Sequence, residues 1–386
     1  MINMDQPARI LHVLGGVSLG GAESRIMDLY RCMDRSKIQF DFLVHFDDAD
    51  ARKPEFYDEE IKAMGGRIFA LPRFNVYNCI IYRKAVIEFF KEHHEFALVQ
   101  GHMTSTAALY LPIAKKAGVP VVAAHARSAG VDKGIKGIVT KWLRIPLIKR
   151  ADYCFACSRE AGEAVFGRKW ERSDKAMVLP NAIASEKYVF DKEKRGKIRE
   201  KLDINDCYVI GHVGRFHYAK NHEFLLKVFA ALHAGMKERK VRAVLLLLGD
   251  GAGMDAVKAQ AEELGLKEDI LFMGNKKDVE NYYQAMDYFV FPSRFEGLPG
   301  TVVEAQAAGL QCIISDKITP EVRFCELVHY ENIDKPADVW AEYILAHAFY
   351  ERADMHELTK EAGFDVEEQA AKMEGFYLKE TRFPPL

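Results

Sequence analysis

ILHVLGGVSLGGAESRIMDLYRCM, residues 10–33, holds the pattern that decides the fold. It begins with a run of almost entirely apolar residues, as in a strand that is buried on both faces of a sheet. A glycine-rich loop follows, and from Ala22 onward apolar residues recur at helical spacing. A buried strand that leads through a loop into an amphipathic helix is the unit from which parallel α/β sheets are built.

This alternation continues along the chain in two series. The first series has predicted strands at ILHVL, FDFLV, FALVQ, PVVAA and YCFAC, and it closes near residues 177–183. The second has predicted strands at CYVIGHV, AVLLLLG, DILFMG, DYFVFPS and LQCIIS. Between them, residues 185–206 are highly charged and contain no apolar strand, which predicts a linker and a solvated helix. The sequence therefore predicts an α/β fold of two tandem, doubly wound Rossmann-like domains.

Ligands of doubly wound sheets bind at the carboxyl ends of the strands. Two such domains are expected to face a shared cleft with these edges. The residues that directly follow each strand are therefore the first candidates for a functional site.

The composition excludes several classes of protein. The 386 residues include 54 Lys and Arg against 56 Asp and Glu, so no overall field favours nucleic acid. No apolar run reaches about 18 residues, and residues 1–14 show no signal peptide, so a cytoplasmic protein is expected. Cys154 and Cys157 form a lone C-x-x-C without a second pair or a neighbouring His, which predicts neither a metal site nor a cofactor.

The glycine-rich loop admits several interpretations. Residues 16–20, GVSLG, match the G-x-S-x-G pattern of serine hydrolases, which needs the serine on a sharp turn between strand and helix. Here the strand is expected to end near Leu14 and the helix not to begin before Ala22, so the segment is too long. Its glycines also lack the G-x-G-x-x-G spacing of dinucleotide sites. A plain turn remains open, but four glycines favour a loop that approaches an anion beside a helix N-terminus.

Two cations follow the strand CYVIGHV of the second series. Arg215 and Lys220 are spaced so that both can converge on one diphosphate, although the same spacing also suits two surface cations. Asn221 is expected to cap the helix that follows.

The segment EGLPGTVVE, residues 296–304, contains two glutamates eight positions apart. A loop precedes a helix predicted from Thr301, so Glu304 lies one turn inside the helix and Glu296 in the loop before it. The free N–H groups of the helix N-terminus can bind a phosphate between the two carboxylates. Hydroxyls on either side could donate to the carboxylates, which is the layout of a sugar nucleotide. Glycosidases also use two carboxylates, but these flank the scissile bond and need no phosphate donors between them.

Taken together, these features resemble the retaining glycosyltransferases of family 4, which have the GT-B fold, and among them the bacterial exopolysaccharide and capsule enzymes. The matching segments, in family order, are GGVSLGGAE (15–23), QGH (100–102), AAHARS (123–128), LPNAI (179–183), GRFHYAKNH (214–222), LLGDGAG (247–253) and EGLPGTVVEAQAAG (296–309). One departure is Ala182, where the family often has glycine after the asparagine. It puts only the shape of that loop in doubt.

The resemblance implies a domain organisation and an activity. Residues 1–187 would form the acceptor-side domain, with a helix at 366–386 packing back on it, and residues 188–365 the domain that binds the nucleotide-sugar donor. The enzyme would move a hexose or N-acetylhexosamine, with retention, from a nucleotide sugar that is expected to be UDP-linked. The acceptor would be a glycan or a lipid-linked sugar.

The resemblance also implies roles for individual residues. Glu296 would contact the donor sugar, Glu304 the ribose, and Arg215 and Lys220 the diphosphate, while His125 would lie near the reacting sugar. No metal is expected, because the two cations can supply the positive charge that the leaving group needs. Further donor contacts are expected from Gly16, Gly20, Gly21, Met273, Gly274, Leu298, Pro299, Gly300 and Thr301. His102 would either join the site or cap the helix after it.

Residues 127–150 concentrate seven basic residues against one acid, Asp132, among interleaved apolar residues. One interpretation is a crossover helix whose apolar face packs on the sheet while its lysines face water. The other is a basic surface that rests on an anionic membrane, at the inner face of the cell membrane, where a lipid-linked acceptor would be found.

Two rival functions share the same scaffold. One is a UDP-sugar 2-epimerase, which would need further acid and base groups that the sequence does not identify. The other is a non-catalytic GT-B partner protein, in which loss of one of the two cations or two glutamates is expected, whereas all four are present.

Overall fold

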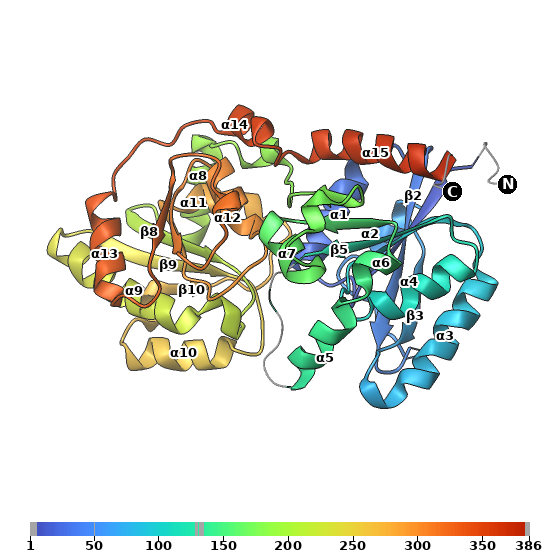
Figure 1. The fold of residues 1–386 in the computed structure, drawn as a ribbon. Coiled ribbons are helices and arrows are strands. Elements are labelled where there is room, and N and C mark those ends of the chain that lie inside the picture. The colour runs from blue at the N-terminus through green and yellow to red at the C-terminus, as the bar shows by residue number, and fades with distance from the viewer. Residues whose placement is uncertain (1–5, 50, 128–129, 131–134, 383–386) are drawn as a thin grey trace. The chain divides into compact units, whose positions relative to one another are not determined.

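The computed structural model describes residues 6–49, 51–127, 130 and 135–382. The chain divides into two compact units, Met1–Ala182 with Val366–Leu386, and Ile183–Asp365. Each unit consists of a parallel sheet with helices on both faces (Figure 1). Among the described residues, no helix is both long enough and apolar enough to cross a membrane.

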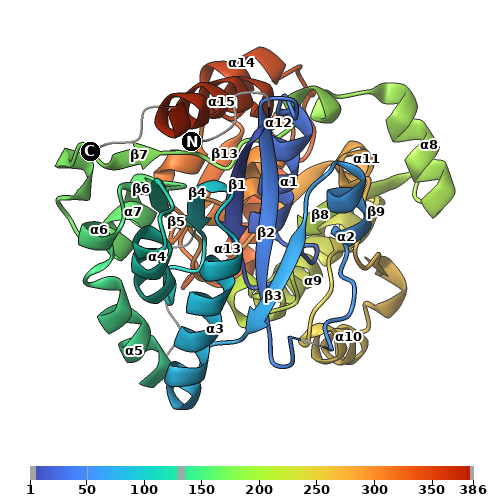
Figure 2. The same ribbon diagram turned by 90° about the vertical axis from the view of Figure 1, so that its right-hand side faces the viewer.

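The sheet of the first unit has seven strands in the order β3-β2-β1-β4-β5-β6-β7, all paired in parallel (Figure 2). The direction in which strands are added reverses between the neighbours β1 and β4, so the unit is doubly wound, as predicted. The strands are β1 (Ala8–Val13), β2 (Ile38–Phe46), β3 (Ile68–Pro72), β4 (Phe96–Gly101), β5 (Val121–Ala126), β6 (Tyr153–Ala156) and β7 (Ala176–Val178).

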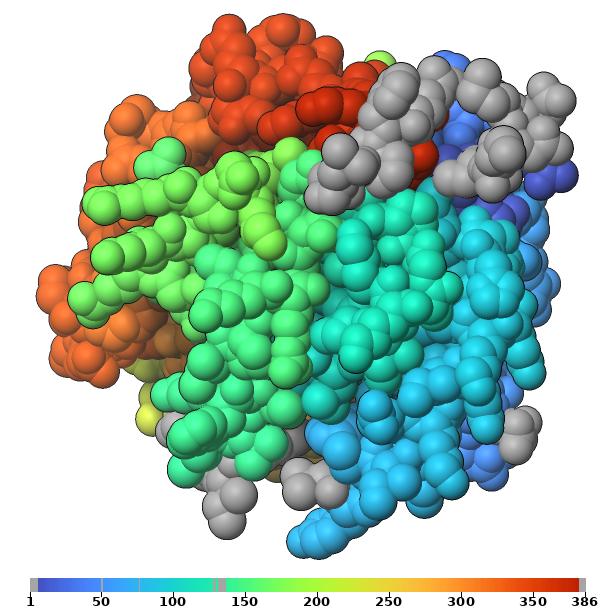
Figure 3. Space-filling model, turned by 45° about the vertical axis from the view of Figure 1, so that its right-hand side comes forward, coloured from blue at the N-terminus to red at the C-terminus, as the bar shows by residue number. Residues whose placement is uncertain are grey.

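Eight helices of the described chain cover this sheet. They are α1 (Gly21–Cys32), α2 (Asp58–Ala63), α3 (Cys79–Glu92), α4 (Ala107–Lys116), α5 (Ile135–Arg144), α6 (Leu147–Arg150), α7 (Arg159–Phe166) and α15 (Val366–Arg382), with short 3-10 turns η1 (Val76–Asn78) and η2 (Trp170–Arg172). Segments α3 to α6 form much of one face of the unit (Figure 3). The last helix, α15, packs against α1 and against strands β1, β2 and β4.

The sheet of the second unit has six strands in the order β10-β9-β8-β11-β12-β13, again all parallel. Its reversal point lies between β8 and β11, so this unit is also doubly wound. The strands are β8 (Cys207–Val213), β9 (Arg242–Leu248), β10 (Ile270–Phe272), β11 (Tyr288–Phe291), β12 (Gln311–Ser315) and β13 (Val328–Glu331). Near-continuous burial of these strands explains why their sequences are apolar runs rather than alternating patterns.

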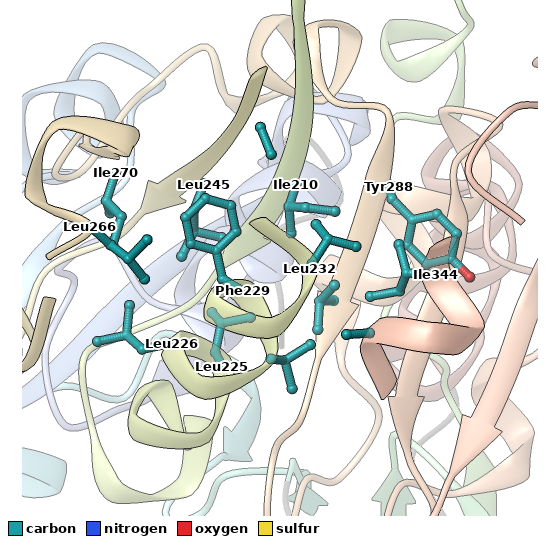
Figure 4. Close-up of a cluster of buried hydrophobic side chains, with 14 of the residues drawn as sticks. Ile210, Leu225, Leu226, Phe229, Leu232, Leu245, Leu266, Ile270, Tyr288 and Ile344 are labelled. Carbon is teal, nitrogen blue, oxygen red and sulfur yellow. The ribbon is translucent and has the colours of Figure 1, made fainter. Parts of the chain in front are cut away.

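The helices of the second unit bury an apolar face on each side of its sheet. On one side, Leu225, Phe229 and Leu232 of α9 pack against strand residues such as Ile210 and Leu245 (Figure 4). Their spacing of three and four residues places them on one helix face. The helices are α8 (Lys192–Leu202), α9 (His222–Glu238), α10 (Met254–Glu263), α11 (Val279–Ala285), α12 (Gly300–Ala307), α13 (Ala337–Ala346) and α14 (His356–Glu361), with 3-10 turns η3 (Ser185–Tyr188), η4 (Tyr218–Lys220), η5 (Lys267–Asp269) and η6 (Pro320–Val322).

Helix α8 is less solvated than its charged sequence predicts. Arg199 is buried, and its guanidinium donates to the carbonyl of Ala285, 2.8 Å away, and lies 3.2 Å from a carboxylate oxygen of Asp287. Arg195 donates to the carbonyl of Ala285 as well and also pairs with Asp287. The prediction of a solvated helix is wrong on this face, because positive charges are stabilised where they meet the carbonyl end of another helix, here α11.

Candidate functional site

In the second unit, the loops after β8 and β11 bring two predicted residues into contact. Lys220 Nζ lies 2.7 Å from Glu296 Oε1, and the two side chains are only 17% and 18% exposed. The Lys220 ammonium also lies over the ring of Phe291, 4.6 Å from its centroid. Because β8 and β11 are neighbours at the reversal point of the sheet, residues from distant parts of the sequence meet at its carboxyl edge.

The loop after β8 is tied to the loop after β11 by Asn221. This residue adopts a left-handed conformation with φ of 57°, and its side-chain amide donates to the carbonyl of Pro292 at 3.2 Å. It occupies the N-cap position before α9, but its side chain makes no capping hydrogen bond there, so the prediction of a side-chain cap is wrong. The side chain is committed to a contact between loops that the local sequence does not reveal.

Arg215 is exposed directly after β8, and no ion pair in the described chain engages it. Its backbone is held by a close approach of the loop after β9. Gly249 has φ of 129°, and a Cβ atom there would lie 2.2 Å from the carbonyl oxygen of Gly214. The Phe216 N–H donates to the carbonyl of Asp250 at 3.0 Å. Glycine at 249 is therefore required by both its conformation and the space available.

The second glutamate lies inside α12, as the sequence predicts for Glu304. It is buried, and Tyr283 donates its phenol O–H toward the Glu304 carboxylate at 2.8 Å. Tyr283, from α11, was not identified from the sequence, because nothing in NYYQAM links it to a residue some twenty positions later. The carboxylate is thus held in a fixed orientation with one oxygen satisfied by the protein.

The N-terminus of α12 lies between the two glutamates. The helix begins at Gly300 after Pro299, and its first N–H groups have no acceptor within the helix. Beside it, the buried hydroxyls of Ser293 and Thr301 have no hydrogen-bond partner within the described part of the chain. Such unsatisfied donors suit an anion with several oxygens, such as a phosphate group.

The remaining predicted residues of this unit lie at the same edge of the sheet. Met273 and Gly274 follow β10, and Gly249 donates its N–H to the carbonyl of Gly274 at 2.9 Å. Gly274 has φ of 63°, which favours glycine. Leu298 is buried in the loop before α12.

In the first unit, the glycine-rich loop connects β1 to α1. Helix α1 begins at Gly21, with Gly20 at the capping position, one residue earlier than predicted. Gly16 and Ser18 lie in the loop of residues 14–20 that separates β1 from α1, so Ser18 is not on a sharp turn directly between strand and helix. This geometry excludes the nucleophile elbow of serine hydrolases.

The carboxylate of Glu55, which the sequence did not single out, holds the glycine-rich loop in place. Glu55 accepts a hydrogen bond from the Val17 N–H at 2.7 Å and another from the Ser18 hydroxyl. A Cβ atom on Gly16 would lie 2.7 Å from Glu55 Oε1, so the carboxylate can approach only because residue 16 is glycine. Arg52 lies 3.8 Å from the same carboxylate and donates to Asp58. Nothing in PEFYDEE distinguishes Glu55 from its acidic neighbours.

Three histidines lie together at the carboxyl edge of the first sheet. His125 is the last residue but one of β5 and is 2% exposed; its ring centroid lies 5.2 Å from that of His102, which in turn stacks on His12 of β1. Burial lowers the pKa of His12 to about 3 and holds the pKa values of His102 and His125 well below the ordinary value. All three imidazoles are therefore neutral. His102 joins this cluster, where the sequence left a helix-capping role open.

Residues 135–150 present apolar side chains to solvent. Ile138, Trp142 and Ile145 are 58%, 71% and 68% exposed, while Leu147 is buried. The expectation of a helix that packs its apolar face on the sheet is therefore wrong for α5. Arg127 also leaves the predicted basic cluster, because it donates to Asn181 at 2.9 Å and toward His102. Lys133 lies outside the described residues.

No set of three or more His, Cys, Asp or Glu side chains in the described chain is arranged to hold a metal ion. Cys154 and Cys157 are both buried.

Two protein families match this chain, one in each of the two units. The family described as glycosyl transferases group 1 matches residues 194–345, and glycosyltransferase family 4 matches residues 19–187. The chain is 36% identical over 383 residues, 96% of both chains, to the putative glycosyltransferase EpsF of Bacillus subtilis. It is 28% identical, over 60% of its length and 62% of the relative, to the Escherichia coli UDP-Gal:alpha-D-GlcNAc-diphosphoundecaprenol alpha-1,3-galactosyltransferase.

The fold is shared with solved structures at low identity. A crystal structure of Anabaena HepE in complex with UDP and glucose matches 97% of this chain and 99% of its own, with a TM-score of 0.71 and 16% identity. This similarity concerns the fold, and it confirms the GT-B architecture predicted from the sequence.

The glycine-rich loop gives the first prediction. Replacing Glu55 with Gln removes a charged acceptor while keeping its shape, so the loop loses one or both of its contacts. Charge-assisted hydrogen bonds contribute about 1.5–3 kcal/mol, so we expect amide hydrogen exchange in residues 15–21 to rise by about tenfold or more. Mass spectrometry of the exchanged protein measures this. Glu59→Gln, an exposed change on the same segment, is the matched control, and equal exchange in both variants would contradict the role of Glu55.

Proposed function

We propose a function that rests on one premise: this chain belongs to glycosyltransferase family 4. It is an enzyme of the retaining hexosyltransferase class and acts in polysaccharide biosynthesis. Its specific reaction, in our proposal, is transfer of a hexose or N-acetylhexosamine from a UDP-sugar to a glycan or lipid-linked sugar acceptor.

The contact between Lys220 and Glu296 carries this proposal. Their charged atoms are 2.7 Å apart, so a diphosphate that binds Lys220 brings the attached sugar within reach of Glu296. Arg215 is exposed nearby in sequence and free to fold over the diphosphate. The first N–H groups of α12 add partial positive charge at the same edge of the sheet.

The proposed chemistry uses these groups to stabilise the leaving group. The bond between the anomeric carbon and the phosphate oxygen breaks, and negative charge builds on the diphosphate beside Arg215 and Lys220. The acceptor oxygen bonds to the anomeric carbon, and its proton passes to the leaving diphosphate. Glu296 positions the sugar by accepting hydrogen bonds from the sugar hydroxyls. Its negative charge also stabilises the positive charge that develops on the sugar ring.

Glu304 is the proposed partner of the ribose. A buried carboxylate must be hydrogen-bonded to be tolerated, and Tyr283 satisfies one of its oxygens. A carboxylate held in this orientation is suited to accept hydrogen bonds from ribose hydroxyls. Met273 and Gly274, which follow β10 at the same edge of the sheet, are assigned to the base, and His125 in the first unit to the reacting sugar.

The donor nucleotide is assigned from relatives. HepE was solved with UDP and glucose, and the E. coli relative is named for UDP-Gal and a diphosphoundecaprenol acceptor. These names support a UDP-sugar donor and a lipid-linked acceptor for this chain.

A lipid-linked acceptor would require the enzyme to reach a membrane, and α5 is suited to this. Residues 135–150 contain no acid, and Lys141, Lys149 and Arg150 are exposed beside the exposed Ile138 and Trp142. Tyr77 of η1 and Ile80 and Ile81 at the start of α3 are also exposed, and α3 and α5 reach the same end of the first unit (Figures 1 and 2). We propose that this end rests on anionic lipid at the cytoplasmic face of the membrane.

The donor assignment predicts a thermal shift. UDP and a UDP-hexose should raise the melting temperature of the chain, and raise it further at higher concentration, because a ligand that binds only the folded state stabilises it. GDP and ADP should raise it less. Differential scanning fluorimetry measures this, and a clear preference for GDP or ADP would overturn the base assignment. Conversion of UDP-N-acetylglucosamine alone to its epimer would favour the rival epimerase.

The charge assignment predicts a loss of turnover. Arg215→Ala and Lys220→Ala should each lower kcat by about 100-fold or more, since each removes a cation aimed at the leaving group. Glu304→Ala should mainly raise the Kd for UDP, which calorimetry measures. Lys227→Ala, an exposed change on α9, is the control.

Near-native turnover of both Arg215→Ala and Lys220→Ala would contradict this mechanism. Activity should also survive EDTA; if it is abolished and then restored by magnesium or manganese, a metal carries the charge assigned to the two side chains. A chain with no transferase activity toward any donor would favour the non-catalytic alternative.

The membrane assignment predicts salt-dependent sedimentation with vesicles. Each basic residue near an anionic surface contributes about 1 kcal/mol, so binding should be strong at low salt and fade toward roughly 0.5 M by screening. Lys141→Glu/Lys149→Glu should lose most binding, and Trp142→Ser should weaken it. Lys227→Glu/Lys237→Glu, with the same change in net charge on α9, should bind normally. Equal binding to neutral vesicles, or none to anionic ones, would contradict the proposal.

A further inference from the structure

A chain of hydrogen bonds links the last helix to His125. Tyr377 of α15 donates its phenol O–H to Gln100 Oε1 at 2.7 Å, and Gln100 Nε2 lies 3.0 Å from His125 Nδ1. Tyr377 is fully buried and Gln100 nearly so, which leaves neither side chain a water partner in place of these contacts. None of this was visible in the sequence, where Tyr377 lies far from the strands it touches.

The donors and acceptors in this chain have fixed directions. Because the phenol donates to the amide oxygen, the amide nitrogen faces the histidine, and an amide nitrogen can only donate. Nδ1 of His125 is therefore the acceptor. The imidazole is neutral, since burial and the nearby Arg127 charge hold its pKa well below the ordinary value. A neutral ring carries one proton, so it lies on Nε2.

A second chain orients the other two histidines in the same sense. Arg127 donates its Nε–H toward His102 Nδ1 at 3.4 Å, and a guanidinium has no acceptor. His102 must then carry its proton on Nε2, which lies 3.0 Å from His12 Nδ1. The Nε2 atoms of His12 and His125 are buried and have no partner in the described part of the chain. Two oriented N–H donors therefore remain unsatisfied at the carboxyl edge of this sheet.

We propose that Tyr377 and Gln100 are positioning residues that hold His125 in its Nε2–H form, so that it donates a hydrogen bond to an oxygen of the bound substrate. This inference rests on the proposed function, which assigns His125 to the reacting sugar. In this role His125 does not accept the acceptor's proton, because its only basic nitrogen is occupied by Gln100. An unsatisfied buried donor is costly in the free protein and is stabilised when a ligand oxygen meets it.

The tautomer is measured directly on the full chain labelled with 15N-histidine. Long-range 1H–15N correlation should show His125 with a protonated Nε2 and a bare Nδ1, the signal being assigned by its disappearance in His125→Gln. In Tyr377→Phe and in Gln100→Met the Nδ1–H form should gain population, because the directed donor to Nδ1 is lost. A protonated Nδ1 in the native chain overturns the proposal.

Kinetics then separate positioning from structure. Tyr377→Phe should lower kcat by about tenfold, the size of one net hydrogen bond, with little change in the KM for donor. Tyr30→Phe is the matched control: Tyr30 is also fully buried, packs on the same Phe40 ring and hydrogen-bonds through its hydroxyl, but in the described part of the chain its hydroxyl contacts are to Gln39 and Met64 and not to a histidine. Equal kcat in the two variants overturns the positioning role, and thermal denaturation confirms that both fold.

Replacement of His125 itself tests the donor role. Gln can place an amide N–H near the position of Nε2, whereas Leu cannot, so His125→Gln should keep kcat within about tenfold of native while His125→Leu loses about 100-fold. Equal loss in both variants overturns the donor role. The NMR measurement needs no substrate, so a chain that transfers no sugar would refute the proposed function while the tautomer is still decided independently.

Discussion

The parallel pairing of β8 with β11 is the constraint on which the candidate site of the second unit depends. Strands are added in opposite directions on either side of this pair, so the loops that follow the two strands diverge above and below the sheet. The gap that they leave is where Lys220, Glu296 and the start of α12 meet. In the first unit, the pair β1 and β4 has the same arrangement, with the glycine-rich loop after one strand and His102 after the other.

The carboxyl edges of the two sheets differ in the charges of their side chains. The second unit places opposite charges at hydrogen-bond distance, with Lys220 and Glu296 partly shielded from water, so neither ion is buried alone. The first unit instead buries three histidines as neutral rings and admits one guanidinium, Arg127, whose pKa burial lowers to about 10.

Much of the second unit's site could be predicted, because its residues follow strands that are recognisable as apolar runs. Arg215, Lys220 and Glu296 lie directly after such strands, and Glu304 follows from helical spacing. The contacts that orient them were not predictable. Tyr283, Glu55 and Gln100 act on residues distant in sequence, and their types are common in any chain. Asn221 was given the wrong role, because a residue before a helix fits a cap locally while the tertiary contact with Pro292 decided its use.

The sequence by itself determined the class of fold, the positions of most strands and the segments proposed to carry the chemistry, because burial on both faces and helical periodicity are local patterns. The tertiary structure alone decided which side chains touch. It exposed Ile138 and Trp142 on α5 and drew Arg127 into the histidine cluster. It also set the direction of the hydrogen bonds from Tyr377 to His125. Hydrogen-bond direction and ion pairing depend on distances of a few ångströms between segments, and no local pattern encodes these distances.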